Sequence, residues 1–189
     1  MFPLVSIIIP VYNRLDLFEK AIDSALNQTY SHIEVIVVDD GSEEPIEALV
    51  NEKKKISRFR IHYLRQENSG PGAARNAGLN KASGVYVQYL DADDILLPEK
   101  IERQVKILEF APEKVACLCG WEAIDLRSGK RLVRDMTNLP SDLLEAALNN
   151  RFWPTLAPLW HYANRSIPVW PGLIGGEDIV HDISVGIHQ

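Results

Sequence analysis

Three aspartates, Asp91, Asp93 and Asp94, crowd the chain directly after an apolar segment at 85–90. Carboxylates this close repel one another and raise one another's pKa unless a cation joins them. A divalent ion such as Mg²⁺ or Mn²⁺ would balance this charge, because it prefers carboxylate and phosphate oxygens. It could also offset the charge that develops on a departing nucleoside diphosphate. The competing interpretation is a solvated turn in which Asp94 caps the next helix, but the position at a strand end favours a metal site.

Two further aspartates, Asp39 and Asp40, follow a second apolar segment at 33–38. A carboxylate at this place could accept a hydrogen bond from the N–H of a nucleotide base, which favours a uracil-type base. Gly41 can supply the turn, and Ser42 can cap the next helix. Turn and cap chemistry explains Gly41 and Ser42 completely, but it explains the two aspartates less well.

A tyrosine and an asparagine follow the first apolar segment, at 5–11. Pro10 lies within that segment and has no backbone N–H, so it argues for the end of a strand. Tyr12 is then placed to stack on a nucleotide base, although a buried core tyrosine fits the position nearly as well. Asn13 is placed to cap the helix that follows.

A glycine-rich stretch at 68–76, NSGPGAARN, leads into a short predicted helix. Such a loop at a helix N-terminus can face an anion, and Arg75 adds a charge that can reach a phosphate or a base. The stretch does not fit the dinucleotide fingerprint, because no Gly-x-Gly-x-x-Gly follows the first strand. Taken alone, it is a weak motif.

Short apolar runs alternate with helical spacing through the first part of the chain. The expected strands are 5–11, 33–38, 59–64, 85–90 and 115–119. This alternation predicts an α/β fold with a mainly parallel central sheet flanked by helices. Ligands of such sheets bind beyond the carboxyl ends of the strands, where three of the four polar clusters lie.

The pattern changes after Gly120 and becomes more irregular. The elements expected there are a hairpin at 121–135, a helix at 141–150, loops and short strands at 152–176, and a final helix at 176–188. Packing rather than sugar stacking is favoured for at least two of the tryptophans, Trp153, Trp160 and Trp170. We expect one domain over 1–189, with a nucleotide-binding half at 1–120 and a more irregular half at 121–189, which the family resemblance given below makes a nucleotide-sugar-binding half and an acceptor-side half.

The net charge of -6 argues against nucleic acid as a partner, because binding to its backbone needs a basic face. No apolar run approaches the ~20 residues that span a bilayer, and no secretory signal is visible. The two cysteines, Cys117 and Cys119, fit small buried side chains in a reducing compartment. We expect a cytoplasmic location, with peripheral association at the inner face of the membrane as an open alternative.

Together, the four polar segments resemble the inverting family-2 glycosyltransferases with the GT-A fold. The matching text is VSIIIPVYNR, then HIEVIVVDDGS, then NSGPGAARNAGLNKASGVYVQYLDADD. This joint order and spacing is far more specific than any single motif. The resemblance implies transfer of a sugar from a nucleoside-diphosphate donor, usually uridine-based, to an acceptor hydroxyl with inversion. It also implies a place in the synthesis of cell-surface polysaccharide or another glycan.

The resemblance places the donor site on the matching motifs. The expected donor contacts are Pro10, Tyr12, Asn13, Asp39, Asp40, Arg75, Asp91 and Ala92. Tyr12 would stack on the base, and Asp39, with Asp40 as the alternate, would bind it. Asp91 would approach the ribose or the metal, and Asp93 would be the principal ligand of Mg²⁺ or Mn²⁺.

In the resembled family, the general base lies in a Glu-Asp pair near the start of a late helix. The pair Glu177-Asp178 matches, so Asp178 is the expected base, although an aspartate at a helix N-terminus is also favourable electrostatically. The match is loose between 121 and 176, and only 179–189 follow Asp178. The Gln-x-x-Arg-Trp segment typical of processive synthases is missing. The acceptor, whether a glycan, a lipid-linked or another hydroxyl compound, is not indicated.

Two alternatives stay open. A non-catalytic fragment that binds the donor or a partner would bind UDP without turnover. A nucleotidyltransferase on a related sheet would need a loop rich in glycine and arginine after the first strand, and Tyr12-Asn13-Arg14 contains no glycine.

Overall fold

The structure is a computed structural model that describes residues 2–110, 116–125, 127–134, 154–162 and 170. Its elements in chain order are β1 (Val5–Val11), α1 (Leu15–Leu26), β2 (Ile33–Asp39), α2 (Ile46–Ile56), β3 (Arg60–Arg65), α3 (Pro71–Lys81), β4 (Tyr86–Tyr89), α4 (Lys100–Phe110), β5 (Ala116–Cys117), β6 (Trp121–Ile124), β7 (Arg131–Arg134) and β8 (Leu159–His161). The helices predicted at 141–150 and 176–188 lie outside the described residues. No helix within the described ranges has the length and apolar character needed to cross a bilayer.

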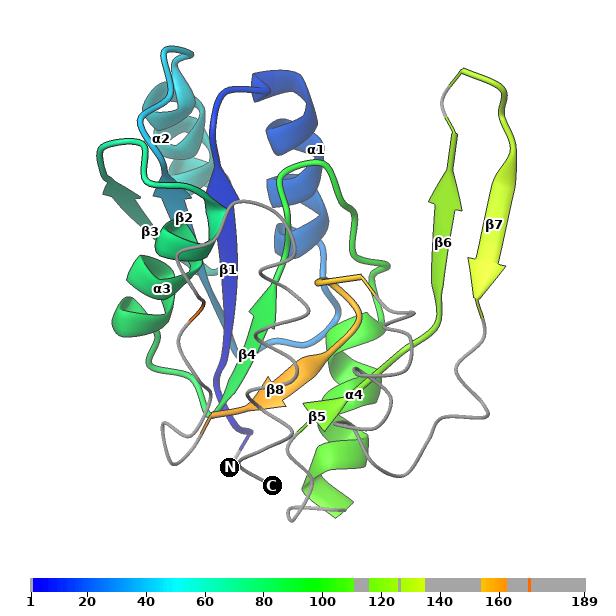
Figure 1. Ribbon diagram of the computed structural model, residues 1–189. Coiled ribbons are helices and arrows are strands. Elements are labelled where there is room, and N and C mark those ends of the chain that lie inside the picture. Colours follow the sequence, from blue (N-terminus) through cyan, green and yellow to red (C-terminus); the bar gives the residue numbers. More distant parts are fainter. Residues whose placement is uncertain (1, 111–115, 126, 135–153, 163–169, 171–189) are drawn as a thin grey trace.

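Six strands form the central sheet in the order β3-β2-β1-β4-β8-β5 (Figure 1). The neighbours β3, β2, β1 and β4 are parallel, whereas β8 pairs antiparallel with both β4 and β5. The predicted mixed α/β fold with a mainly parallel sheet is therefore confirmed. The strand expected at 115–119 is shorter than predicted, and β8 separates it from β4.

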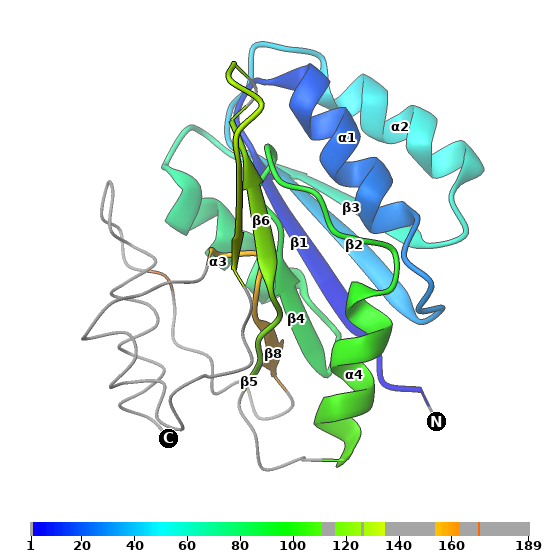
Figure 2. The same cartoon turned by 90° about the vertical axis from the view of Figure 1, so that its right-hand side faces the viewer.

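Both faces of the sheet are covered by helices, as the continuous apolar strands require. Helices α1, α2 and α4 lie on one face and α3 lies on the other (Figure 2). Side chains of β1 alternate between the two resulting cores: Val5, Ile7 and Ile9 face the first, and Ile8 faces the second. The second core also holds Trp160, which is 2% exposed.

The starts of α1 and α2 differ from the prediction, because neither helix has a side-chain cap and the loops before them instead bond to each other. The Asn13 side-chain oxygen accepts a hydrogen bond from the Glu43 N–H at 2.9 Å, and the Asn13 N–H donates to Ser42 Oγ at 2.8 Å. The first N–H of α1, that of Leu15, donates to Glu44 Oε2 at 2.5 Å. The prediction that Asn13 and Ser42 cap the helices following them was therefore wrong. These long-range contacts fix the loops at the carboxyl ends of β1 and β2.

The buried side chain of Lys100 belongs to a polar network that links β5 and the turn before β8 to β4. The Lys100 ammonium donates to the side-chain oxygens of Gln88 and Gln104, and burial lowers the pKa of Lys100 to about 8. The amide nitrogen of Gln104 donates to the carbonyls of Cys117 and Ala157, at 2.5 and 2.9 Å. One polar network therefore connects α4 and β4 with β5 and the turn before β8.

Replacing Lys100 by methionine should lower the free energy of unfolding by about 2 kcal/mol, because it leaves two buried amide oxygens without their donor. The depressed folded pKa of Lys100 adds stability as pH rises from about 8 toward the ordinary lysine value of 10.5, and the variant should lack this rise. Urea denaturation at several pH values measures both. The control is Lys106→Met, since Lys106 pairs with Glu102 on the exposed side of α4 and should cost less than about 0.5 kcal/mol. Equal losses in the two variants would contradict the role of the network.

The predicted hairpin of the second half is confirmed. Strands β6 and β7 pair antiparallel, with Trp121 opposite Arg134 and Ile124 opposite Arg131. Figure 1 shows this pair standing apart from the central sheet. Of the tryptophans expected to pack, Trp160 and Trp170 are buried, at 2% and 4% exposure, whereas Trp153 lies outside the described residues.

Candidate functional site

The strand order reverses at one point of the central sheet, between the neighbouring parallel strands β1 and β4. The chain passes from β1 outward to β2 and β3, and then returns to β4 on the other side of β1. In open parallel sheets, ligands bind in the crevice beyond the strand ends at such a point. Tyr12 follows β1 and Asp91 follows β4, so two of the predicted clusters flank this point.

Pro10 lies one residue before the end of β1 and opposite Val38 of β2. Strand β4 ends earlier, because its last residue pairs with Ile8. Beyond Ile8, β1 therefore has a strand neighbour on one side only, which is where a proline is tolerated. Tyr12 is 50% exposed, so it does not belong to the core and its ring is accessible at the strand end.

The acidic cluster is charge-balanced by two arginines from different elements. Asp91 Oδ1 accepts from Arg75 Nη2 at 2.6 Å, and Asp93 Oδ2 accepts from Arg14 Nη1 at 2.7 Å. Burial, and then the neighbouring charges of Asp91 and Asp93, raise the pKa of Asp94 to about 7. Three carboxyl groups thus share two guanidinium groups, and the third retains its proton into the neutral range.

Asp94 does not cap the following helix. Its backbone N–H donates to the Asp91 carbonyl at 3.0 Å in a tight turn, and α4 begins only at Lys100. Ala92, within this turn, is half-buried and packs against the first core. The turn therefore holds the three carboxyl groups at the end of β4, and the capping interpretation of Asp94 was wrong.

Arg75 is buried, at 3% exposure, and its guanidinium lies 4.3 Å from the ring centroid of Trp170. Asn76 fixes the backbone of Trp170: its side-chain oxygen accepts the Trp170 N–H at 2.7 Å, and its side-chain nitrogen donates to the Trp170 carbonyl at 2.9 Å. Trp170 therefore packs against the guanidinium group that bonds to Asp91. Sequence reasoning missed this contact, because the partners are more than ninety positions apart and neither type nor spacing connects them.

Asp39 is buried and held within the protein. Its carboxylate accepts hydrogen bonds from the Ser42 N–H at 2.8 Å and from Tyr63 Oη and Arg65 Nη1 at 2.6 Å each. Burial alone would raise its pKa, but the bonds from Tyr63 and Ser42 and the charge of Arg65 outweigh this and lower the pKa of Asp39. Asp39 is thus a hydrogen-bonded carboxylate anchor for the ends of β2 and β3.

Asp40 organises the glycine-rich loop. Its Oδ1 accepts from the Ser69 N–H and its Oδ2 from the Gly70 N–H, both at 2.9 Å, directly before α3. Gly70 has a positive φ of 88°, which glycine adopts without strain. The anion that these N–H groups face is therefore a side chain of the protein. Direct contact of Asp39 or Asp40 with a base remains a prediction.

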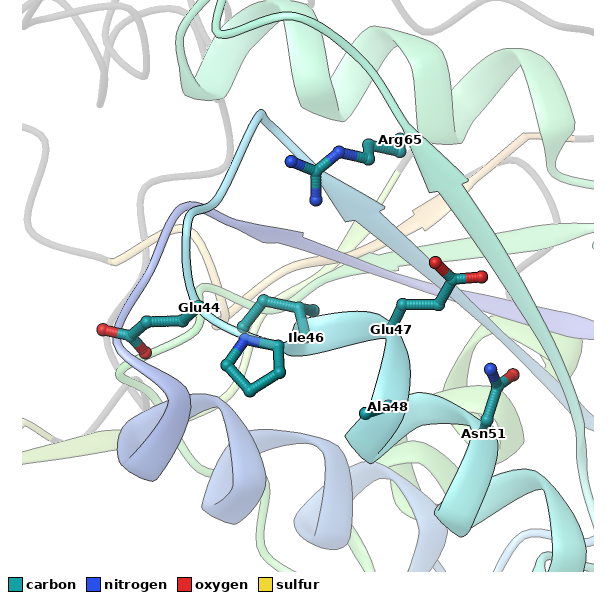
Figure 3. Close-up of a pocket in the computed structure, with 7 residues that line it drawn as sticks. Glu44, Ile46, Glu47, Ala48, Asn51 and Arg65 are labelled. Atoms are coloured by element: carbon teal, nitrogen blue, oxygen red, sulfur yellow. The ribbon is translucent and has the colours of Figure 1, made fainter.

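A shallow cavity of about 420 Å³ lies at the start of α2 (Figure 3). The side chains of Glu44, Glu47 and Arg65 line it together with the first turn of α2. Arg65 reaches from there to Asp39. The cavity is thus on the β3 side of the sheet edge, and β2 and β1 separate it from the acidic cluster after β4.

Within the described residues, no group of three or more His, Cys, Asp or Glu side chains is arranged to hold a metal ion. Protein-bound Mg²⁺ commonly has only one or two carboxylate ligands and takes the rest from phosphates and water. Asp91 and Asp93, whose side chains are 27% and 48% exposed, fit such a partial donor set. The predicted base Asp178 lies outside the described residues.

The sequence comparisons agree with this geometry. The family model described as glycosyl transferase family 2 matches residues 6–166, which include β1 to β8 apart from the first residue of β1. The chain belongs to glycosyltransferase family 2. The resemblance that the motifs indicated is thereby confirmed.

Curated relatives of this family-2 chain are longer than it is. An uncharacterized glycosyltransferase of Rickettsia prowazekii is 46% identical over 127 residues, which cover 67% of this chain and 39% of that protein. The glycosyltransferase GlyA of Streptococcus pneumoniae is 41% identical over 107 residues, or 56% of this chain and 15% of that protein. TuaG of Bacillus subtilis, named for teichuronic acid biosynthesis, is 42% identical over 113 residues, or 59% and 43%. The matched part of this chain therefore spans less than half the length of each relative.

Solved structures share the fold at low sequence identity. Residues 1–349 of S. aureus TarS in complex with UDP match with a TM-score of 0.74 at 20% identity, over 98% of this chain and 55% of that one. The mannosyltransferase PcManGT from Pyrobaculum calidifontis, in complex with GDP-Man and Mn²⁺, matches with a TM-score of 0.72 at 21% identity, over 96% and 51%. The GT-A fold of the family-2 chain is thus confirmed.

Proposed function

We propose that this chain carries the donor site of an inverting glycosyltransferase that moves a sugar from a UDP-sugar to an acceptor hydroxyl. The observation that supports this most directly is the placement of Tyr12 directly after β1 and of Asp91 and Asp93 directly after the neighbouring parallel strand β4. An exposed aromatic ring and a carboxylate pair at one sheet edge match the two ends of a nucleoside diphosphate. TarS has been solved with UDP and with UDP-GlcNAc, which favours a uridine donor.

Each donor-side residue then has a distinct task. Tyr12 stacks on the base, and Asn13 and Pro10 shape the loop that presents it. Asp40 and the charged anchor Asp39 hold the loops around the base, with direct base contact from one of them. Further along the crevice, Arg75 fixes Asp91 toward the ribose, beside the Ala92 turn.

Asp93 and Asp91 would hold Mg²⁺ or Mn²⁺ together with diphosphate oxygens. When bound, such an ion stabilises the negative charge of the departing diphosphate. PcManGT has been solved with Mn²⁺, which supports a divalent ion in this fold. Burial, and then the charges of Asp91 and Asp93, raise the pKa of Asp94, and the same neighbouring charges favour a cation beside them.

Asp178 is the proposed general base. It would take the proton of the acceptor hydroxyl while the hydroxyl oxygen bonds to the anomeric carbon and the bond from that carbon to the diphosphate breaks. Attack from the face opposite the diphosphate inverts the anomeric configuration. The acceptor is proposed to be a glycan, lipid-linked or other hydroxyl compound of cell-surface polysaccharide synthesis, in line with the relative TuaG. A lipid-linked acceptor would place the reaction at the cytoplasmic face of the membrane.

The proposal is tested by screening UDP-, GDP- and dTDP-sugars for Mn²⁺-dependent thermal shift and donor hydrolysis. We expect stabilisation and slow hydrolysis with one or more UDP-sugars and little response to the others. Absence of metal-dependent binding of any nucleoside diphosphate to the folded protein would contradict the proposal. Binding without hydrolysis or transfer would instead favour the non-catalytic alternative.

Replacing Tyr12 by alanine should weaken UDP binding by about 5- to 150-fold, because base–aromatic stacking contributes about 1–3 kcal/mol. Tyr12 is half-exposed, so the fold should be unaffected. The matched control is Tyr12→Phe, which keeps the ring and should bind UDP within about twofold of the parent. Calorimetric titration with UDP and Mn²⁺ measures the three affinities. A Tyr12→Ala protein that binds as the parent does would exclude stacking.

A further inference from the structure

An ion pair connects the segments that follow β1 and β4. Arg14 follows β1 and Asp93 follows β4, and Arg14 Nη1 lies 2.7 Å from Asp93 Oδ2. The two side chains are 62% and 48% exposed, so water reaches both partners. A pair with this exposure stabilises the protein little, because hydration competes with it. Its position beyond the carboxyl ends of β1 and β4 points to a role in ligand binding rather than in folding.

The backbone that carries Arg14 is held in an uncommon conformation. Asn13 and Arg14 have consecutive positive φ values, of 56° and 60°. For arginine this left-handed region is disfavoured by roughly 1–2 kcal/mol, and such residues collect at functional sites. The contacts that impose it come from the β2–α2 loop, through Ser42 Oγ, Glu43 N–H and Glu44 Oε2. These contacts hold the residues on either side of Arg14, whose side chain reaches Asp93.

The two arginines of the acidic cluster differ in freedom. Arg75 is buried and stacked on Trp170, so its bond to Asp91 belongs to the folded core. Arg14 is an exposed side chain whose bond to Asp93 can break without disturbing any packing. A divalent ion bound to Asp93 would lie close to the Arg14 guanidinium and would be repelled by it.

We propose that Arg14 is an internal counter-ion of Asp93 that the divalent ion displaces when it binds. The inference rests on the proposed function, because it takes Asp93 as the metal ligand. In the absence of the ion, the Arg14 guanidinium neutralises the Asp93 carboxylate. When the ion binds to Asp93, the ion pair between Arg14 and Asp93 breaks. Arg14 thereby keeps the affinity for free metal low until the donor supplies further oxygen ligands.

Arg14→Gln should therefore tighten the binding of Mn²⁺ alone by about two- to fivefold, the upper value corresponding to the ~1 kcal/mol of an exposed ion pair. The measurement is a Mn²⁺ titration followed by water-proton relaxation, with no nucleotide present. The charge-matched control is Arg103→Gln, since Arg103 is an exposed residue of α4 that pairs with Glu99. It should bind Mn²⁺ as the parent does. Asp93→Asn should lose the binding, which locates the ion.

A second titration separates the inference from the proposed function. The affinity for UDP is measured for the parent and for Arg14→Gln at a fixed, subsaturating Mn²⁺ concentration. If parent UDP binding depends on Mn²⁺ but Arg14→Gln binds Mn²⁺ no more tightly than the parent, the counter-ion role is wrong and the donor site stands. The same holds if Arg103→Gln tightens Mn²⁺ binding equally, because the effect would then be one of net charge. If parent UDP binding is independent of Mn²⁺, both proposals fail.

Discussion

Asp93→Asn should lower kcat/KM for sugar transfer at least ~100-fold, the largest loss we expect from any residue of the donor side. A metal that stabilises a leaving diphosphate contributes several kcal/mol to the transition state, and 2.7 kcal/mol is about 100-fold. The substitution keeps the shape of the side chain and removes the charge on which the ion depends. The measurement is initial rate with the UDP-sugar that the donor screen selects, at saturating Mn²⁺, or donor hydrolysis if the acceptor is unidentified.

The matched control is Asp94→Asn, one position further along the same turn. Asp94→Asn also keeps the shape of the side chain and removes one carboxyl group, but Asp94 is not proposed as a ligand of the ion. We expect a loss of less than about tenfold. Equal losses for Asp93→Asn and Asp94→Asn would contradict the assignment of Asp93 as the principal metal ligand.

Most of the sheet was predictable because the local sequence of each long strand has a recognisable apolar pattern. Fully buried parallel strands are continuous β-branched runs, and VSIIIPV and IEVIVV can hardly form anything else between turn residues. Strand β8 was not predictable in this way. Its three residues, Leu159–His161, have no pattern of their own and become a strand only because β4 and β5 lie on either side. The register and order of the strands depend on long-range packing, which the spacing of residues within a short segment does not reveal.

The candidate site shows the same division. The clusters were correctly located at strand ends, because a polar group directly after a buried run must lie at the sheet edge. Their partners were not foreseen. Asp40 faces the backbone of Ser69 and Gly70, and Asp93 meets Arg14 only because β4 returns beside β1. The wrong helix caps have a related cause: Asn13 has the right type and place for a cap, but the neighbouring loop offers its side chain N–H groups that suit it better.

Asp178→Asn should lower kcat for transfer by about 10²- to 10⁴-fold, the range that a positioned general base contributes. UDP binding in the presence of Mn²⁺ should stay within about twofold, because the proposed base contacts the acceptor and not the nucleotide. The matched control is Glu177→Gln, the other member of the Glu-Asp pair, which should lose much less activity. Calorimetry with UDP and rates with the selected donor measure the two properties separately.

The pattern of results from these two variants decides between an enzyme and a binding fragment. The parent should lose rate toward acidic pH as the base becomes protonated, and this limb should vanish in Asp178→Asn, because an amide does not titrate in that range. A variant with full activity would exclude Asp178 as the base. A variant that loses UDP binding along with activity would show that Asp178 supports the donor site instead. If the parent itself binds UDP but never transfers or hydrolyses the sugar, donor binding stands without catalysis, since the proposed donor-side residues provide the former and only a base near the acceptor provides the latter.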